Sequence, residues 1–289
     1  MAVININDLI AKFPKRSADA QKGDLGHVLV IAGSTSYTGA AYLTSQAAAL
    51  SGSGLVTLAA GKSIHPILAE KLTEVMVRLF IETKDGSLSL MAEKDILSFS
   101  QNCDCAAIGP GISKNKETQA LVRDLITKFS KPIVLDADGI NALAGHTEIL
   151  KKAKSPIILT PHPGEMARLI EKGISDIQAD RKTLALAFAN EYNTILVLKG
   201  HETVVASPAG DVYINSTGNP GMATGGAGDV LTGMVASFVG QGIAAFEASC
   251  LAVYFHGLSG DMAAKEKGFL SLLASDLLRK LPDALRMLA

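Results

Sequence analysis

Tryptophan is absent from the sequence, and only three of its 289 residues are cysteine. The cysteines, Cys103, Cys105 and Cys250, are odd in number and lack the spacing of a metal-binding motif. This argues against a disulfide framework and against a structural zinc site. We therefore expect free thiols in a reducing compartment, the cytoplasm.

Long apolar runs and an excess of one charge are missing as well. No segment approaches the roughly 20 apolar residues that a membrane-spanning helix needs. Residues 1–20 contain both acidic and basic side chains and no continuous apolar core, so we do not expect a signal peptide. The net charge is −1. We therefore expect neither nucleic acid nor a membrane as a partner.

Two common nucleotide-binding motifs are not found. Residues 60–63, Ala-Gly-Lys-Ser, resemble the end of a P-loop, but that motif needs a glycine at position 56, where the chain has Val56. No G-x-G-x-x-G follows any segment that has the composition of a strand. This argues against a Rossmann nicotinamide dehydrogenase and leaves other modes of nicotinamide binding open.

The sequence does contain a regular alternation of strand-like and helical segments. Short runs that are apolar nearly throughout are typical of strands buried on both faces; they occupy residues 27–32, 55–59, 74–79, 106–108, 132–136, 156–160 and 194–198. Helical periodicity lies between them, for example in residues 39–51 and 116–129. The alternation predicts an α/β fold, with a mostly parallel sheet flanked by helices on both faces.

The last third of the chain has a different pattern. Residues 203–207 and 211–215, joined by Pro208–Gly210, predict an antiparallel hairpin. From Val230 onward the pattern is helical, with breaks around Gly240–Gly242 and near Lys267–Gly268. The sequence has no internal repeat and no linker-like stretch, so we expect one domain spanning residues 1–289.

A glycine-rich loop, Gly218–Gly233, runs directly into one of these helical segments. The start of a helix offers unpaired amide groups and the positive end of the helix dipole, which together make an anion site. One acid, Asp229, lies in this loop. Two interpretations of Asp229 are open at this point: a general base that takes a proton from an attacking hydroxyl, or a helix cap.

Small, polar and charged residues also follow the predicted strands, where ligands bind in parallel sheets. They are Gly33, Ser34, Thr38–Ala41, Gly109–Gly111, Asp136, Asp138, Asn141, Thr160–Glu165 and Lys199–Glu202. Each has a structural alternative. Gly109–Gly111 could be a plain turn and the two aspartates could cap a helix. His162 could be a buried, satisfied histidine, Glu165 could complement a helix N-terminus, and Lys199 could be an ordinary surface charge.

The glycine loop, with Gly-Ala-Gly-Asp at residues 226–229, resembles that of the ribokinase-like superfamily. More narrowly, the chain resembles the ADP- or ATP-dependent NAD(P)H-hydrate dehydratase family. The resemblance follows the family's order over nearly the whole chain, in the blocks GHVLVIAGS (26–34), TGAA (38–41), IGPG (108–111), PIVLDADGINAL (132–143), ILTPHPGE (158–165), LKGHETVVA (198–206) and NSTGNPGMATGGAGDVLTG (215–233). The last block, together with TPHPGE, is the most specific.

The resemblance implies a role for each site residue. Asp229 would be the catalytic base, and the amides of Gly226, Ala227 and Gly228 would form the anion hole. The hydrated nicotinamide would lie against Ala40, Ala41, Gly111, His162 and Asp229. The adenine nucleotide would lie against Lys199, Gly200, His201, Glu202, Thr203 and Gly228. Mg²⁺ is expected with the nucleotide, with Asp136, Asn141 and Glu165 as candidate ligands through water; its direct ligands are not assigned.

By the same resemblance, the chain would use ADP or ATP to restore NADH or NADPH from the S epimer of its hydrate. Many family members carry an additional N-terminal epimerase domain; the first block here begins at residue 26, so we expect the epimerase to be a separate protein. The family also suggests a homotetramer. Two rival functions are a small-molecule kinase of the same fold, whose product keeps the phosphate, and a nucleotide sensor without catalysis. The presence of Asp229 argues against the sensor.

Overall fold

The computed structural model describes residues 4–288. Over that range nine strands form one continuous sheet in the order β3-β2-β1-β4-β5-β6-β7-β8-β9. The bounds are β1 His27–Ile31, β2 Leu55–Gly61, β3 Met76–Phe80, β4 Cys105–Ile108, β5 Ile133–Leu135, β6 Ile157–Leu159, β7 Ile195–Leu198, β8 Val204–Ala206 and β9 Val212–Ile214. All pairings from β3 to β7 are parallel, and β8 and β9 add antiparallel strands. The predicted α/β sheet and its terminal hairpin are confirmed.

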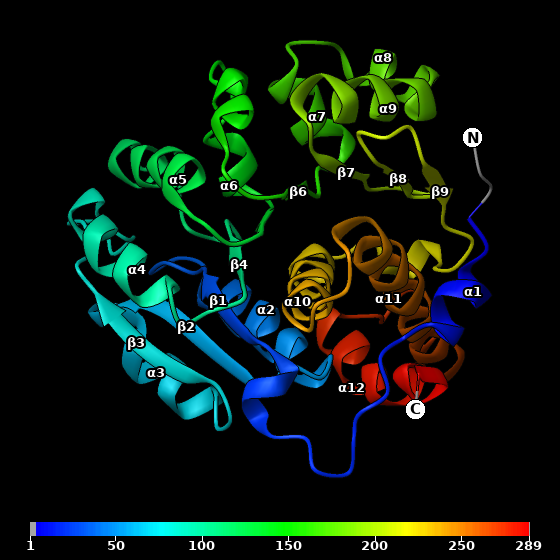
Figure 1. Ribbon diagram of the computed structural model, residues 1–289, viewed down its shortest axis with the longest axis horizontal. Helices are drawn as coiled ribbons and strands as arrows, with labels where there is room; N and C mark the ends of the chain where they lie inside the picture. Colours follow the sequence, from blue (N-terminus) through cyan, green and yellow to red (C-terminus); the bar gives the residue numbers. More distant parts are fainter. Residues whose placement is uncertain (1–3, 289) are drawn as a thin grey trace.

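Helices cover both faces of this sheet (Figure 1). Their bounds are α1 Ile6–Ala11, α2 Thr38–Leu50, α3 His65–Lys71, α4 Glu93–Ser100, α5 Lys116–Lys128, α6 Asp138–Asn141, α7 Pro163–Leu169, α8 Ile174–Ala179, α9 Arg181–Tyr192, α10 Ala227–Gly240, α11 Ala245–Lys267 and α12 Ala274–Leu285. The helical breaks expected at 240–242 and 267–268 fall at the ends of α10 and α11.

The central strands separate two hydrophobic cores. In β1, Val28 and Val30 face the core shared with α2, α10, α11 and α12, whereas Leu29 and Ile31 face the core shared with α4, α5, α7 and α9. Successive side chains of a strand point to opposite faces. A strand that is apolar throughout is therefore buried on both sides, as the sequence pattern indicated.

The expectation of burial on both faces is wrong for residues 74–79. The corresponding strand, β3, lies at the edge of the sheet and pairs only with β2 within the described chain. Met76 and Leu79 are each 44% exposed, and Arg78 stacks over the ring of Phe99, 4.4 Å from its centroid. An edge strand has a neighbour on one side only, so its composition alone does not determine how much of it is covered.

Helix α10, which begins in the glycine loop, is deeply buried. Figure 1 places it at the centre of the molecule between the sheet and α11. Its residues from Val230 to Gly240 are all buried. Close packing against α2 depends on Gly233, where a Cβ would lie 2.1 Å from the carbonyl oxygen of Thr44. Along the 4–288 range, none of the helices combines the length and apolarity that a bilayer crossing requires.

Candidate active site

The sheet brings together segments that the sequence places after separate strands. Because β1, β4, β5, β6 and β7 are parallel, the loops that follow them leave the sheet at one edge. The first two loops are hydrogen-bonded to each other: Gly33 N donates to the carbonyl of Pro110 at 2.8 Å, and Ser34 Oγ donates to the carbonyl of Gly111 at 2.8 Å. The loops expected to bind a ligand are thus neighbours.

Three of the residues assigned to the hydrate lie together at the start of α2. Gly111 has a φ of 63°, and a Cβ there would lie 2.9 Å from the Cβ of Ala40. Ala41 is fully buried, with its methyl group packed against Gly33. Ala41 therefore lies beneath the surface that Ala40 and Gly111 form together.

The glycine loop ends in a free helix N-terminus. Helix α10 begins at Ala227, and its N-cap, Gly226, has a φ of 91°, which a residue with a Cβ rarely adopts. Among residues 4–288, the amides of Gly226 and Gly228 find no backbone acceptor, and the amide of Ala227 makes only a long hydrogen bond of 3.4 Å to Thr224. These amides and the helix dipole form an anion site.

Asp229 lies in the first turn of α10 and does not cap it. The N-cap is Gly226, and within the described residues no side chain makes a capping hydrogen bond there. Burial raises the pKa of Asp229 to about 7, and the negative charges of Asp136 and Glu165 add to this, against the opposing effect of Lys199. The helix-cap interpretation is therefore wrong. A carboxylate whose pKa lies near neutral pH has the property that a general base needs.

Lys199 is part of a buried charged network next to the anion site. Its Nζ lies 2.6 Å from Oδ1 of Asp136 and 3.9 Å from Oε2 of Glu165, and its side chain is only 19% exposed. A Cβ on Gly228 would lie 3.1 Å from the same Nζ. The interpretation of Lys199 as a surface charge is wrong, and the structure places its ammonium beside Gly228.

Asp136 is the centre of this network. Its other oxygen, Oδ2, accepts a hydrogen bond from Thr232 Oγ1 at 2.7 Å. Burial alone would raise the pKa of Asp136, but Lys199 and the hydrogen-bond donors outweigh it and hold the pKa below its usual value. In turn, the pKa of Lys199 is raised, because the carboxylates outweigh its burial. Both partners are therefore charged at neutral pH.

The segment after β5 does not cap α6 with an aspartate. The N-cap is Ala137, which has a φ of 50°, and across the described chain its side chain makes no capping bond. Asp138 accepts from Ser113 N and from Asn141 Nδ2, each at 3.1 Å. Gly109 packs against this segment so closely that a Cβ would lie 1.9 Å from the Asp136 carbonyl oxygen. The capping interpretation is wrong, and Gly109 is required by packing as well as by the turn.

His162 and Glu165 cap α7 reciprocally. The Nδ1 of His162 accepts from Gly164 N at 3.0 Å, and Oε2 of Glu165 accepts from His162 N at 2.9 Å. The imidazole is 51% exposed, so the buried-histidine interpretation is wrong, whereas the helix-N-terminus role suggested for Glu165 is confirmed. Partial burial lowers the pKa of His162, so the ring is neutral at neutral pH. Its Nδ1 is the acceptor in this state.

Arg181, which was not predicted from the sequence, stabilises the loop that follows β7. Its Nη2 donates to the carbonyl of Leu198 at 2.7 Å, and its Nη1 donates to the carbonyl of His201. Gly200, with a φ of 144°, packs against the guanidinium group, where a Cβ would lie 3.1 Å from Nη2. His201 and Glu202 are exposed, and Thr203 Oγ1 donates to the Gly200 carbonyl at 2.9 Å. No local pattern around Arg181 indicates this role.

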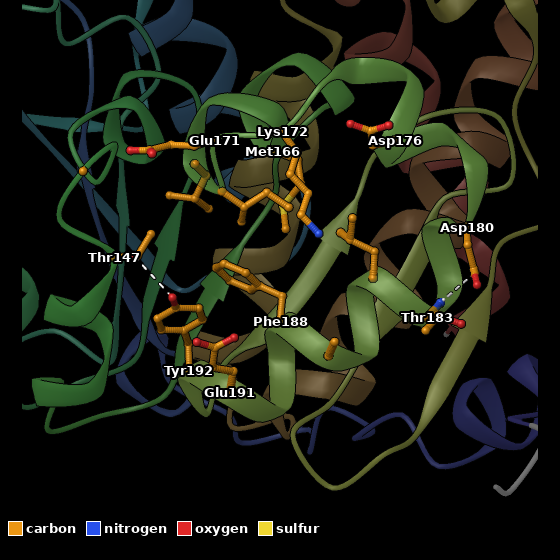
Figure 2. A pocket seen from close by; sticks show the side chains of 15 residues that line it. Thr147, Met166, Glu171, Lys172, Asp176, Asp180, Thr183, Phe188, Glu191 and Tyr192 are labelled. Carbon is orange, nitrogen blue, oxygen red and sulfur yellow. Dashed lines mark hydrogen bonds between the residues drawn. The ribbon is translucent and has the colours of Figure 1, made fainter.

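A separate cavity of about 760 Å³ lies between α7, α8 and α9 (Figure 2). Met166 and Phe188 contribute to its apolar wall, and Glu171, Lys172 and Glu191 are among its charged residues. None of the residues predicted for the site lines it. The candidate active site is therefore defined by its free amides and its charged network, and this cavity is not part of it.

Comparison with known proteins gives a consistent result. The family model for NAD(P)H-hydrate dehydratase matches residues 28–283. The chain belongs to the NAD(P)H-hydrate dehydratase family. It is 34% identical to the ADP-dependent (S)-NAD(P)H-hydrate dehydratase of Neisseria meningitidis, over 92% of this chain and 86% of that protein. It is 46% identical to the bifunctional NAD(P)H-hydrate repair enzyme of Moorella thermoacetica, over 96% of this chain. The chain spans about half the length of such bifunctional relatives, 52% in this case.

Solved structures of the family have the same fold. The ADP/ATP-dependent NAD(P)H-hydrate dehydratase of Bacillus subtilis, co-crystallised with ATP and Mg²⁺, superimposes with a TM-score of 0.86 at 33% identity and covers 99% of this chain and 98% of that one. A ribokinase-like superfamily protein from Enterococcus faecalis gives a TM-score of 0.82 at 26% identity, over 99% of this chain and 96% of that one. The expected ribokinase-like fold is confirmed, and family membership favours the dehydratase over the small-molecule kinase.

Proposed function

We propose that the chain uses ADP or ATP to dehydrate the S epimer of hydrated NADH or NADPH and so restores the reduced cofactor. One observation carries this proposal: a carboxyl group with a pKa of about 7, Asp229, lies in the first turn of α10, close to the free amides of Gly226 and Gly228. A base and an anion site at that spacing serve the transfer of a phosphoryl group to a hydroxyl. Family membership supplies the substrate class.

The proposed reaction has two stages. Asp229 takes the proton of the ring hydroxyl as its oxygen attacks the terminal phosphoryl group of the nucleotide, which leaves AMP or ADP. The hydroxyl, a poor leaving group, becomes a phosphate ester. The lone pair of the ring nitrogen then expels orthophosphate, and loss of a proton from the neighbouring ring carbon restores the double bond. Phosphoryl transfer depends mainly on positioning and charge stabilisation, which the amides and Lys199 would provide.

We assign the residues around this centre as follows. The hydrate lies against Ala40, Ala41, Gly111 and His162. The nucleotide contacts the segment from Lys199 through Gly200, His201 and Glu202 to Thr203, and its phosphates approach Gly228. The amides of Gly226, Ala227 and Gly228 hold the transferred group. The closeness of Lys199 Nζ to Gly228 supports a shared phosphate site, and an oxyanion-type donor is worth about 3–4 kcal/mol.

Mg²⁺ fits this site as a nucleotide-bound ion. Within residues 4–288 no three acidic, histidine or cysteine side chains are grouped as a metal cluster. Mg²⁺ commonly keeps several waters and binds substrate phosphates with one or two carboxylates. Glu165 and Asp136, which flank Lys199, could hold it through water, whereas Asn141 is engaged with Asp138 and Arg168. The ion would neutralise charge on the phosphates.

We also propose a cellular setting for this activity. A separate epimerase would supply the S epimer, and the enzyme would act in the cytoplasm as a homotetramer. Size-exclusion chromatography with light scattering tests the tetramer, and addition of an epimerase to a mixture of hydrate epimers tests whether the second epimer then reacts. Consumption of both epimers by this chain alone would contradict the first of these proposals.

The test of the function is a product balance. Protein, hydrated NADH and Mg²⁺ are mixed with ADP or with ATP, and restored NADH is followed by its absorbance while orthophosphate is measured in parallel. We expect NADH and orthophosphate in equal amounts, with ADP as the preferred donor. A phosphorylated hydrate that accumulates without NADH would indicate the kinase. Saturable nucleotide binding without turnover would indicate the sensor. If only ATP works, the preference for ADP is wrong and the dehydratase stands.

A further inference from the structure

Helix α11 contacts the glycine loop at its start, around Gly218, and again at Ala227. Asp261 accepts hydrogen bonds from Gly218 N and from Asn219 Nδ2, each at 2.9 Å. A Cβ on Gly257 would lie 2.2 Å from Thr217 Oγ1, so the helix backbone and the loop are in direct contact. The long helix therefore acts as a fixed support for a loop that is otherwise rich in glycine.

His256 makes the contact of α11 that lies nearest to the chemistry. Its Nε2 lies 2.8 Å from the carbonyl oxygen of Ala227, the first residue of α10. A carbonyl oxygen can only accept, so Nε2 carries the hydrogen. Burial lowers the pKa of His256 to about 4, so the imidazole is neutral at neutral pH and its one proton is on Nε2. The side chain thus donates one fixed hydrogen bond to the start of the helix.

The carbonyl of Ala227 and the amide of Gly228 belong to the same planar peptide group. Fixing the direction of the C=O bond therefore fixes the opposite direction of the N–H bond. The Gly228 amide donates to no backbone acceptor in the described range, and a Cβ on the same residue would lie 3.1 Å from Lys199 Nζ. A hydrogen bond to the carbonyl also polarises the peptide and makes its N–H a stronger donor. Ala227 is already the first residue of α10, so the helix sets the general direction of this carbonyl, and His256 adds a second donor that limits the remaining freedom of a peptide flanked by glycine.

We propose that His256 is a positioning residue for phosphoryl transfer, which acts through the Ala227 carbonyl to hold the Gly228 amide toward the transferred group. This proposal rests on the proposed function, because it concerns the orientation of an amide in the same anion hole. His256 itself would touch neither the nucleotide nor the hydrate. Its contribution should appear when the phosphoryl group is in transfer and not when either substrate binds.

The test compares two replacements of His256 that differ in one donor. His256→Gln keeps an amide N–H at a similar reach, whereas His256→Leu has similar bulk and no donor. Removing an oxyanion donor itself typically costs about 10²- to 10³-fold in kcat, so misaligning one should cost about 10- to 100-fold on that scale. We expect this loss in kcat for His256→Leu, nearly unchanged KM values for both substrates, and recovery of most of the rate in His256→Gln.

Ser249→Ala is the matched control on the same helix. Ser249 Oγ donates to the Ala245 carbonyl at 2.7 Å, so the variant also loses one buried side-chain bond to the backbone, away from the glycine loop. We expect its kcat to be that of the wild type. If His256→Leu fails to fold, His256→Ala with added imidazole replaces it, and recovery of kcat by imidazole is then the expected result.

A second measurement does not need the hydrate. Fluoroaluminate with Mg²⁺ and the product nucleotide, AMP for transfer from ADP or ADP for transfer from ATP, mimics a phosphoryl group in transfer. Its affinity should fall in His256→Leu but not in His256→Gln, while the nucleotide alone binds all forms equally. Equal kcat in wild type and His256→Leu, equal loss in both replacements, or unchanged fluoroaluminate affinity would overturn the role of His256. A wild type that binds fluoroaluminate in this way but forms no NADH would overturn the dehydratase function and leave the role of His256 standing.

Discussion

Replacing Asp229 by asparagine separates its chemical role from its structural role. The two side chains have nearly the same shape, but asparagine neither titrates nor accepts a proton. Burial displaces the pKa of Asp229 from 3.8 to about 7. At about 1.4 kcal/mol for each tenfold change in proton affinity, this corresponds to about 4 kcal/mol of folding free energy, as an upper value. Ionising Asp229 in the folded protein therefore lowers the free energy of unfolding, and the asparagine variant does not have this loss.

The sign of the effect follows from proton binding. Between pH 4 and pH 7 the folded state keeps the proton of Asp229 while the unfolded chain releases it, so the stabilising contribution is lost as the pH rises through the folded pKa. The Asp229→Asn variant should therefore gain stability relative to the wild type as the pH rises, by up to about 4 kcal/mol above pH 8. Urea denaturation of both proteins at pH 5 and at pH 8.5 should show about 3 kcal/mol of this change, because the part that falls between pH 4 and pH 5 has already been lost at the lower pH.

The same variant should lose activity. General-base contributions are typically about 10²- to 10⁴-fold, so turnover of Asp229→Asn should fall by at least about a hundredfold. In the wild type, kcat/KM, which reports the pKa of the free enzyme, should rise with pH through about 7 as the carboxylate forms, and the variant should lack this limb. Asp124→Asn, at an exposed acid of α5, is the control and should change neither property. Near-normal turnover, or stability that follows the wild type at both pH values, would refute the reasoning.

Two further predictions concern the surroundings of the site. In a titration, Lys199→Met should weaken nucleotide binding more than hydrate binding, and it should lower the free energy of unfolding by about 3–5 kcal/mol because the Asp136 carboxylate stays buried without its partner. Adding Asp136→Asn should restore the stability but not the nucleotide affinity. An unchanged nucleotide affinity in Lys199→Met would mean that the lysine has a purely structural role. In thermal melts, Gly233→Ala should lower stability by about 1–3 kcal/mol through overpacking, since its Cβ would collide with the Thr44 carbonyl. The control is Gly39→Ala on α2, where nothing lies within 4 Å of the added Cβ, and it should be neutral or stabilising.

Much of the fold could be predicted because the signals are local. Runs such as 106–108 and 194–198 match β4 and β7 to within a residue, and each of the two helical breaks falls at a glycine that follows a long helical segment. The strand at 74–79 was located correctly but its environment was not, because coverage of a strand depends on what packs beside it. Met76, for example, is 44% exposed on β3, the edge strand of the sheet.

For the candidate site, the sequence by itself determined the glycine loop, its acid and the clustering of polar residues after strands, since each is a property of a few consecutive residues. Whether Asp229 caps a helix or remains free was decided by the tertiary structure, because its pKa depends on burial and on charges brought from other strands. The pairing of Lys199 with Asp136, the contact of Arg181 with the loop after β7 and the contact of His256 with the start of α10 were decided in the same way. These partners lie far apart in the sequence, and only the packing of sheet and helices sets the distances on which their hydrogen bonds and charges depend.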